Sequence, residues 1–100
     1  MQNNITVVVS HFVMPGKEQQ FEQALKQVIQ QAKAFDGYEG IQTIQINNKV
    51  ANEYVLMVRF DTESNYRKWE NSNIRKAWSK ELKEYIVKES KVRYQEGIEF

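Results

Sequence analysis

Apolar and polar positions recur along the chain with two different periods, and these periods predict its secondary structure. Residues 5–14 are dense in β-branched side chains and predict a first strand. The alternation places two sets on opposite faces: Ile5, Val7, Val9, His11 and Val13 against Thr6, Val8, Ser10, Phe12 and Met14. Residues 17–35 have apolar positions at helical spacing, and Gly37 is suited to ending that helix.

The second half of the chain continues this alternation of strands and helices. Residues 40–46 and 53–60 predict two strands of a hairpin, joined by a polar, Asn-rich turn. Residues 91–100 predict a last strand with a bulge at Gly97.

The stretch from residue 61 to 78 contains both tryptophans and predicts two consecutive helices. Trp69 and Trp78 are nine positions apart, so one unbroken helix would turn through about 900° and put them on opposite faces. Ser72 is a favourable N-cap, because its hydroxyl accepts from an unpaired amide of the next turn. We therefore expect a short helix with Tyr66 and Trp69, then a longer helix with Trp78.

The element order β-α-β-β-α-β predicts one α+β domain over residues 1–100, with a ferredoxin-like, four-stranded antiparallel sheet and helices on one face. We expect the opposite sheet face to stay apolar, with Val7, Val9, Val55 and Met57 on it. Monomers seldom expose an apolar patch of several hundred Å². The pattern therefore predicts a homodimer that packs sheet against sheet.

Composition excludes several classes of function. Fourteen Lys and Arg balance thirteen Asp and Glu, which gives no basic surface for nucleic acid. The chain contains no cysteine, and its single histidine argues against a metal site. Residues 5–9 are too short an apolar run for a signal peptide or membrane span, so we expect a cytoplasmic protein with no membrane partner. No motif for a nucleotide or flavin cofactor is present, and we expect none.

Three segments carry a resemblance to a known family. They are SHFVMPGKEQQF at residues 10–21, FDGYEG at residues 35–40, and Arg59-Phe-Asp followed by Trp69-x-x-Ser72-x-x-Arg75. With the predicted element order, nearly the whole chain resembles the antibiotic biosynthesis monooxygenase family of dimeric α+β barrels. None of these segments is a catalytic signature.

The resemblance implies a range of activities. Some relatives oxidise phenolic or quinol-like compounds with molecular oxygen and no bound cofactor, in a pocket between helices and sheet. Others degrade haem and bind its iron through a histidine ten residues after the tryptophan. Ser79 stands at that position here, which argues against haem degradation. Aligned on Phe12 and Gly16, the chain has Ser10 in place of the family's pocket asparagine.

His11 is the candidate catalytic base, since imidazole alone has an unperturbed pKa suited to proton transfer near neutrality. Removing a phenolic proton would activate the ring toward O₂. The competing interpretation, which we favour, places His11 on the inter-sheet face as a structural residue. Strand alternation separates His11 from Ser10 and Phe12, so they cannot line one pocket.

Aromatic and polar residues near the helix break are candidates for ligand contacts. Tyr66 and Trp69 share one helical face and would form a pocket wall or simply pack on the sheet. Asn71 and Arg75 would hold a substrate oxygen or act as cap and surface residues. Trp78 is expected in the core.

These observations predict a cofactor-independent monooxygenase that acts on a small aromatic, phenolic or quinol compound. The predicted catalytic residues are His11 and Trp69, and the predicted substrate-binding residues are Ser10, Phe12, Tyr66, Asn71 and Arg75. We expect the pocket between the second pair of helices and the sheet, lined by Trp69, Tyr66, Ser10 and Phe12. The alternative is a non-catalytic dimeric module that binds a small molecule or serves a stress response.

Overall fold

The computed structural model describes residues 4–47 and 52–96, which form four strands and three helices. In chain order these are β1 (Ile5–Val13), α1 (Glu18–Ala32), β2 (Tyr38–Asn47), β3 (Asn52–Phe60), α2 (Glu63–Glu70), α3 (Asn73–Leu82) and β4 (Lys91–Glu96). The predicted order is confirmed, with two helices in the second crossover. The predicted bulge at Gly97 lies outside the described residues, as do residues 48–51 of the predicted polar turn.

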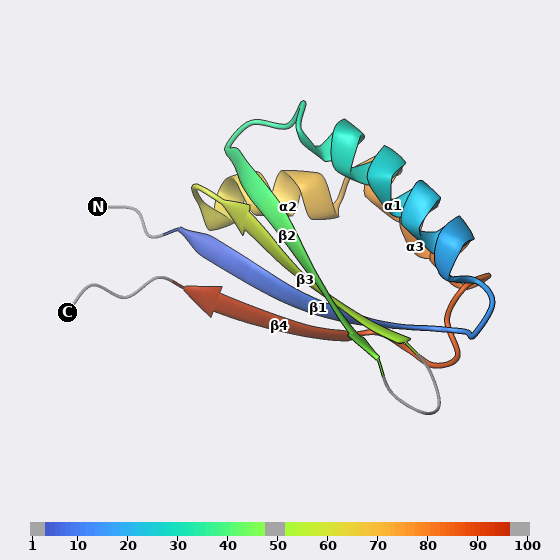
Figure 1. Ribbon diagram of the computed structural model, residues 1–100. Coiled ribbons are helices and arrows are strands. Elements are labelled where there is room, and N and C mark those ends of the chain that lie inside the picture. Colours follow the sequence, from blue (N-terminus) through green and yellow to red (C-terminus); the bar gives the residue numbers. More distant parts are fainter. Residues whose placement is uncertain (1–3, 48–51, 97–100) are drawn as a thin grey trace.

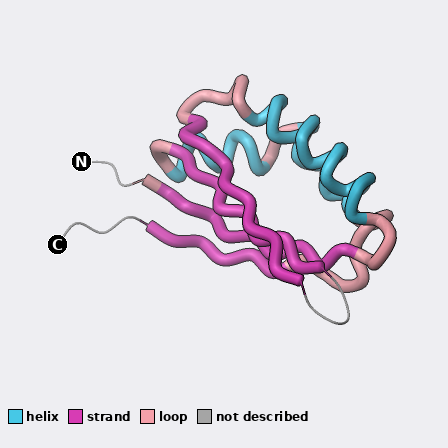
Figure 2. The backbone as a smooth tube through the Cα atoms, in the orientation of Figure 1, coloured by secondary structure: helices cyan, strands magenta, loops and turns pink. Residues whose placement is uncertain are grey.

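The four strands form one antiparallel sheet in the order β2-β3-β1-β4. All three helices lie on one face of this strongly twisted sheet (Figure 1). The tube view shows the opposite face with no helix across it (Figure 2). The α+β ferredoxin-like prediction is therefore confirmed.

Strand pairing decides which side chains face the helices. Val7 lies opposite Val58, and Val9 opposite Leu56, so these four residues share one face. All four are buried, which identifies the helix-covered face. The prediction that Val7 and Val9 lie on the uncovered face with Val55 and Met57 is therefore wrong. Val55 and Met57 do lie on the uncovered face, because they alternate along β3 with Leu56 and Val58, which face the helices.

The predicted helix break at Ser72 is confirmed. Ser72 has an extended backbone, and its Oγ accepts from the Arg75 N–H at 3.1 Å. The same hydroxyl donates to the Trp69 carbonyl at 2.7 Å, next to the end of α2. Thr62 caps α2 in the same way, since its side chain accepts from the Asn65 N–H. One residue thus ends α2 and begins α3, and so sets the angle between them.

The core lies between the sheet and the helices, and its largest fully buried side chains are Phe21, Phe60, Val7 and Val13. Phe21 of α1 packs against Tyr54 and Trp78, with ring centroids 4.7 and 6.0 Å apart respectively. None of the described helices has the length and apolarity that crossing a bilayer requires.

Gly37 closes the connection between α1 and β2. Its φ of +79° lies in the left-handed region that favours glycine, and its carbonyl accepts from the Asp61 N–H at 2.9 Å. A Cβ built on Gly37 would lie 2.1 Å from Asp61 Oδ1. That oxygen also accepts from Asn65 Nδ2 at 2.8 Å, so Asp61 cannot move away without losing a hydrogen bond.

We expect Gly37→Ala to lower the free energy of unfolding by about 2–4 kcal/mol, through left-handed strain combined with the clash at Asp61. Gly16→Ala is the matched control, since Gly16 has a φ of +91° but nothing within 4 Å of the added Cβ. The free energy of unfolding of Gly16→Ala should fall by only about 1–2 kcal/mol. Urea unfolding of both variants measures the difference, and equal losses would contradict the role of Asp61.

Candidate active site

His11 points from β1 into the space under the helices and is 3% exposed. Its Nδ1 lies 2.6 Å from Ser90 Oγ, just before β4. Phe21 and Trp78 meet the imidazole edge-on, with centroids at 5.8 and 6.2 Å. The favoured interpretation of His11 as an inter-sheet residue is therefore wrong, because pairing with Tyr54 puts it on the helix-covered face.

The surroundings of His11 keep it neutral. Burial, and to a lesser extent the nearby positive charge of Arg75, lower the pKa of His11 from 6.5 to about 4. At neutral pH the imidazole therefore carries one N–H and one lone pair. Since Ser90 engages Nδ1, Nε2 is the ring nitrogen left for another molecule.

A small cavity of about 30 Å³ lies between the sheet and the helices. Most of its wall is aliphatic and comes from β1, β2, β3 and α1. The side chains in its lining that can donate or accept a hydrogen bond belong to His11, Trp69, Arg75 and Trp78. The two tryptophans converge here because the chain breaks at Ser72, and it is this break that the sequence predicts.

Arg75 supplies the positive charge at this cavity. It lies in the first turn of α3 and donates through Nη1 to Ser79 Oγ. The residue at the position of the haem-binding histidine thus hydrogen-bonds Arg75. A cation, a neutral imidazole and an apolar wall together suit a small molecule that becomes negatively charged.

Ser10 and Phe12 lie on the uncovered face of the sheet, opposite to His11, so the predicted pocket that joins them to Trp69 is wrong. Ser10 lines a separate hollow with Val8, Val55 and Arg93. Phe12 is buried under the ammonium group of Lys88, which lies 4.2 Å from the ring centroid.

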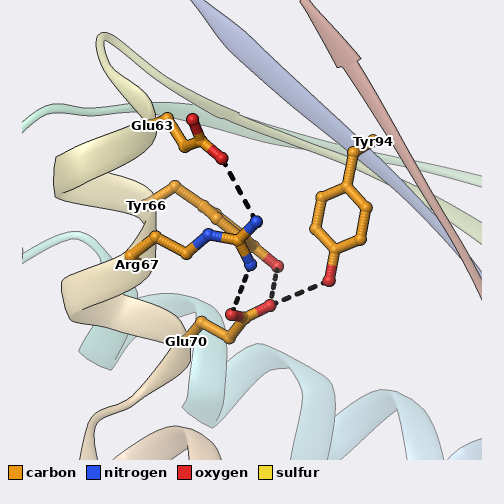
Figure 3. A network of polar contacts seen from close by, with 5 residues as sticks. All are labelled: Glu63, Tyr66, Arg67, Glu70 and Tyr94. Carbon is orange, nitrogen blue, oxygen red and sulfur yellow. Dashed lines mark hydrogen bonds and ion pairs between the residues drawn. The ribbon is translucent and has the colours of Figure 1, made fainter.

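Tyr66 packs beside the cavity instead of lining it. Its ring lies 5.8 Å from that of Phe60, and its hydroxyl donates to Glu70 at 3.2 Å. Glu70 also accepts from Arg67 at 2.7 Å and from the hydroxyl of Tyr94 at 3.0 Å (Figure 3). Although desolvation acts in the other direction, the hydrogen bonds from Arg67 and Tyr94 lower the pKa of Glu70. This network fastens α2 to β4, the edge strand.

Asn71 is exposed at the C-cap of α2, and its N–H bonds the Arg67 carbonyl. It is absent from the cavity lining. The residues described contain no group of three or more histidine, cysteine or carboxylate side chains able to hold a metal ion.

Sequence reasoning missed Ser90 and the contribution of Trp78 to the cavity. Ser90 precedes β4, whose pairing of Lys91 with Ser10 brings it beside His11. That register was not predictable from the sequence. Trp78 was expected only in the core, and it also forms part of the cavity wall.

Comparison with known proteins identifies the family of the chain. The family described as Antibiotic biosynthesis monooxygenase matches residues 4–81, so the chain belongs to that family. A search of curated proteins returned no match.

Solved structures share the fold at low sequence identity. SnoaB, a cofactor-independent oxygenase from Streptomyces nogalater, superposes with a TM-score of 0.83 at 14% identity over 98% of this chain and 96% of its own. A conserved protein from Methanosarcina mazei Go1 has a TM-score of 0.83 at 20% identity over 94% and 92%. Rv0793 from Mycobacterium tuberculosis has 0.83 at 14% identity over 97% of each chain.

The burial of neutral His11 predicts a loss of stability in mild acid. As pH falls below 6.5, the unfolded chain binds a proton at His11, whereas the folded chain does not until about pH 4. The free energy of unfolding therefore decreases as the pH is lowered, by about 2.5 kcal/mol between pH 7.5 and pH 4.5.

Urea unfolding of wild type and His11→Gln at several pH values measures this loss. Other groups titrate in both proteins, so the difference between the two curves isolates His11. We expect the wild type to lose about 2.5 kcal/mol more than the variant over this range. Parallel curves would show that His11 is not held neutral.

Proposed function

We propose that this member of the family is a cofactor-independent monooxygenase that acts on a small phenolic or quinol compound. The observation that carries the proposal is the convergence of His11, Trp69 and Arg75 on one largely apolar cavity. The fold shared with SnoaB, described as a cofactor-independent oxygenase, supports the same reaction class.

His11 would take up the proton of the substrate hydroxyl. In the required tautomer Nδ1–H donates to Ser90 Oγ, which leaves the Nε2 lone pair as acceptor. Its low pKa makes this transfer unfavourable by itself. The charge of Arg75 offsets that cost, because a guanidinium at the same cavity stabilises the phenolate.

The phenolate then reduces oxygen. A ring carbon made electron-rich by the phenolate forms a bond to one atom of O₂, and the resulting peroxide takes up the proton held by His11. Loss of the remaining C–H proton breaks the O–O bond, which leaves a quinone carbonyl and one water. One oxygen atom enters the product, and the two electrons that reduce the other come from the substrate.

The same cavity also suits a non-catalytic binding module. This second candidate is favoured by the small cavity volume, about 30 Å³, which holds water or O₂ but no aromatic ring until side chains move. A ligand that raises the melting temperature without any oxygen uptake would support it.

We also propose that two copies pack through their uncovered sheet faces. This face carries Val8, Val55, Met57, Ile44 and Ile46, and the last two are 50% and 47% exposed in one protomer. An apolar surface of this kind is stabilised by burial against a second copy.

Oxygen uptake with a panel of dihydroxy-aromatic compounds tests the enzymatic proposal. We expect His11→Ala to lower the rate by about 10²-fold or more, because a general base is lost. Trp69→Ala should also lower it, through loss of the cavity wall. Lys26→Ala, an exposed change on α1 outside the cavity lining, is the control and should retain the wild-type rate. Flat traces with wild type across the panel would contradict the proposal.

Sedimentation tests the dimer. We expect wild type to sediment with twice the mass of the 11.9 kDa chain at micromolar concentration. Ile44→Asp should produce monomers, because it places a charge in the apolar interface. Gln30→Asp is the control, since Gln30 is exposed on α1, the helix that lies across the opposite sheet face, and the change should leave the dimer intact. A wild-type monomer would contradict the proposal.

A further inference from the structure

We propose that the open groove between α1 and α3 binds the aromatic ring system of the substrate, and that Trp78 controls its access to His11. The groove has a volume of about 340 Å³. This inference rests on the proposed function and adds a second binding site, a selectivity residue and a restriction on substrate charge.

The volume of the groove suits an aromatic ring system better than does the small cavity beside His11, which we call the inner cavity. About 30 Å³ is enough for one or two water molecules, whereas an apolar cavity that takes up benzene measures about 150 Å³. The groove lies within the range of about 300–1,000 Å³ typical of small-molecule sites. A fused two-ring compound therefore fits the groove, and the inner cavity as it stands does not admit it.

The groove and the inner cavity share a wall. Val28 of α1 and Trp78 of α3 line both spaces. Trp78 is buried, and its indole also contacts the imidazole of His11 edge-on. A change in the side-chain rotamer of Trp78 would therefore join the two spaces and bring a ring bound in the groove up to His11.

The groove has an apolar floor and a polar rim. Small or aliphatic side chains, Ala24, Val28, Ile74 and Ala77, leave room beside the Trp78 indole. Gln27, Gln31, Asn73 and Glu81 supply the polar groups. A flat ring packs against such a floor, while its hydroxyl groups hydrogen-bond the amides at the rim.

Glu81 restricts the charge of the ligand. Glu81 lines the groove, and its carboxylate accepts from the Tyr85 hydroxyl at 3.1 Å; the ion pairs found among the described residues do not include it. A carboxylate attracts hydroxyl donors and repels anions. The groove therefore selects uncharged, hydroxyl-bearing aromatic compounds and rejects aromatic acids of the same size.

Calorimetric titration of the full chain with 2-naphthol and 2-naphthoate tests the proposal, because the two probes share a ring system and differ in charge. We expect 2-naphthol to bind at least tenfold more tightly than 2-naphthoate. Ala77→Phe, which fills the groove from an exposed helix position, should weaken 2-naphthol binding at least tenfold. Lys76→Phe adds the same side chain at an exposed position outside the groove lining and should change binding less than twofold.

Trp78→Phe tests the shared wall. The smaller ring should admit larger substrates, so the ratio of kcat/KM for a three-ring to a two-ring quinol should rise several-fold. Thermal melting of each variant confirms that it is folded.

The proposal is overturned if 2-naphthol fails to bind wild type, if Ala77→Phe binds it unchanged, or if 2-naphthoate binds equally well. The titrations require no turnover. Binding in the groove without oxygen uptake would therefore contradict the enzymatic proposal and leave the groove assignment intact.

Discussion

The structure depends on one constraint, the alternation of side chains along the central strand β1. Ile5, Val7, Val9, His11 and Val13 all face the helices and are buried. Because β1 pairs with both β3 and β4, the residues opposite these five positions on the two neighbouring strands point to the same face, under the helices. The same alternation along β1 places His11 under α1 and α3 and Ser10 on the other face of the sheet. The pairing of β1 with its two neighbours therefore determines both which residues form the core and which residues lie at the candidate site.

Local signals in the sequence were sufficient for the elements and their order. The clearest case is the break between α2 and α3, where a serine cap resolves the nine-residue spacing of the two tryptophans. Periodicity and capping are short-range properties, so they can be interpreted without knowledge of the tertiary fold. This is why the break was predicted and why Trp69 and Trp78 do reach one cavity.

The face of β1 that meets the helices was harder to predict, because both faces are largely apolar. The sequence nevertheless distinguishes the two faces. Two polar residues, Thr6 and Ser10, lie on one face, whereas the other face carries the aliphatic residues Ile5, Val7, Val9 and Val13. On β3 the charged Arg59 likewise marks the outer parity, and it is exposed. Comparing the polar residues on the two faces would have placed His11 correctly. The contact with Ser90 is different, since it depends on the register between β1 and β4, which no local pattern encodes.

The electrostatics of the cavity connect the fold to the proposed chemistry. Burial removes the charge of His11, and Arg75 reinforces this effect, so the cavity contains one fixed positive charge in place of two. The guanidinium of Arg75 is partly exposed and takes part in none of the ion pairs found among the described residues, so a molecule that becomes negatively charged beside it is stabilised. Under the proposed mechanism a phenol would meet this requirement only once it loses its proton, and the neutral imidazole of His11 would receive that proton. On the proposed mechanism the proton transfer would leave a phenolate beside Arg75 and a protonated His11, so the net charge in the cavity would stay the same. The carboxylate of Glu81, which lines the groove between α1 and α3, would complement this arrangement, because under our proposal it admits a neutral phenol and repels anionic compounds.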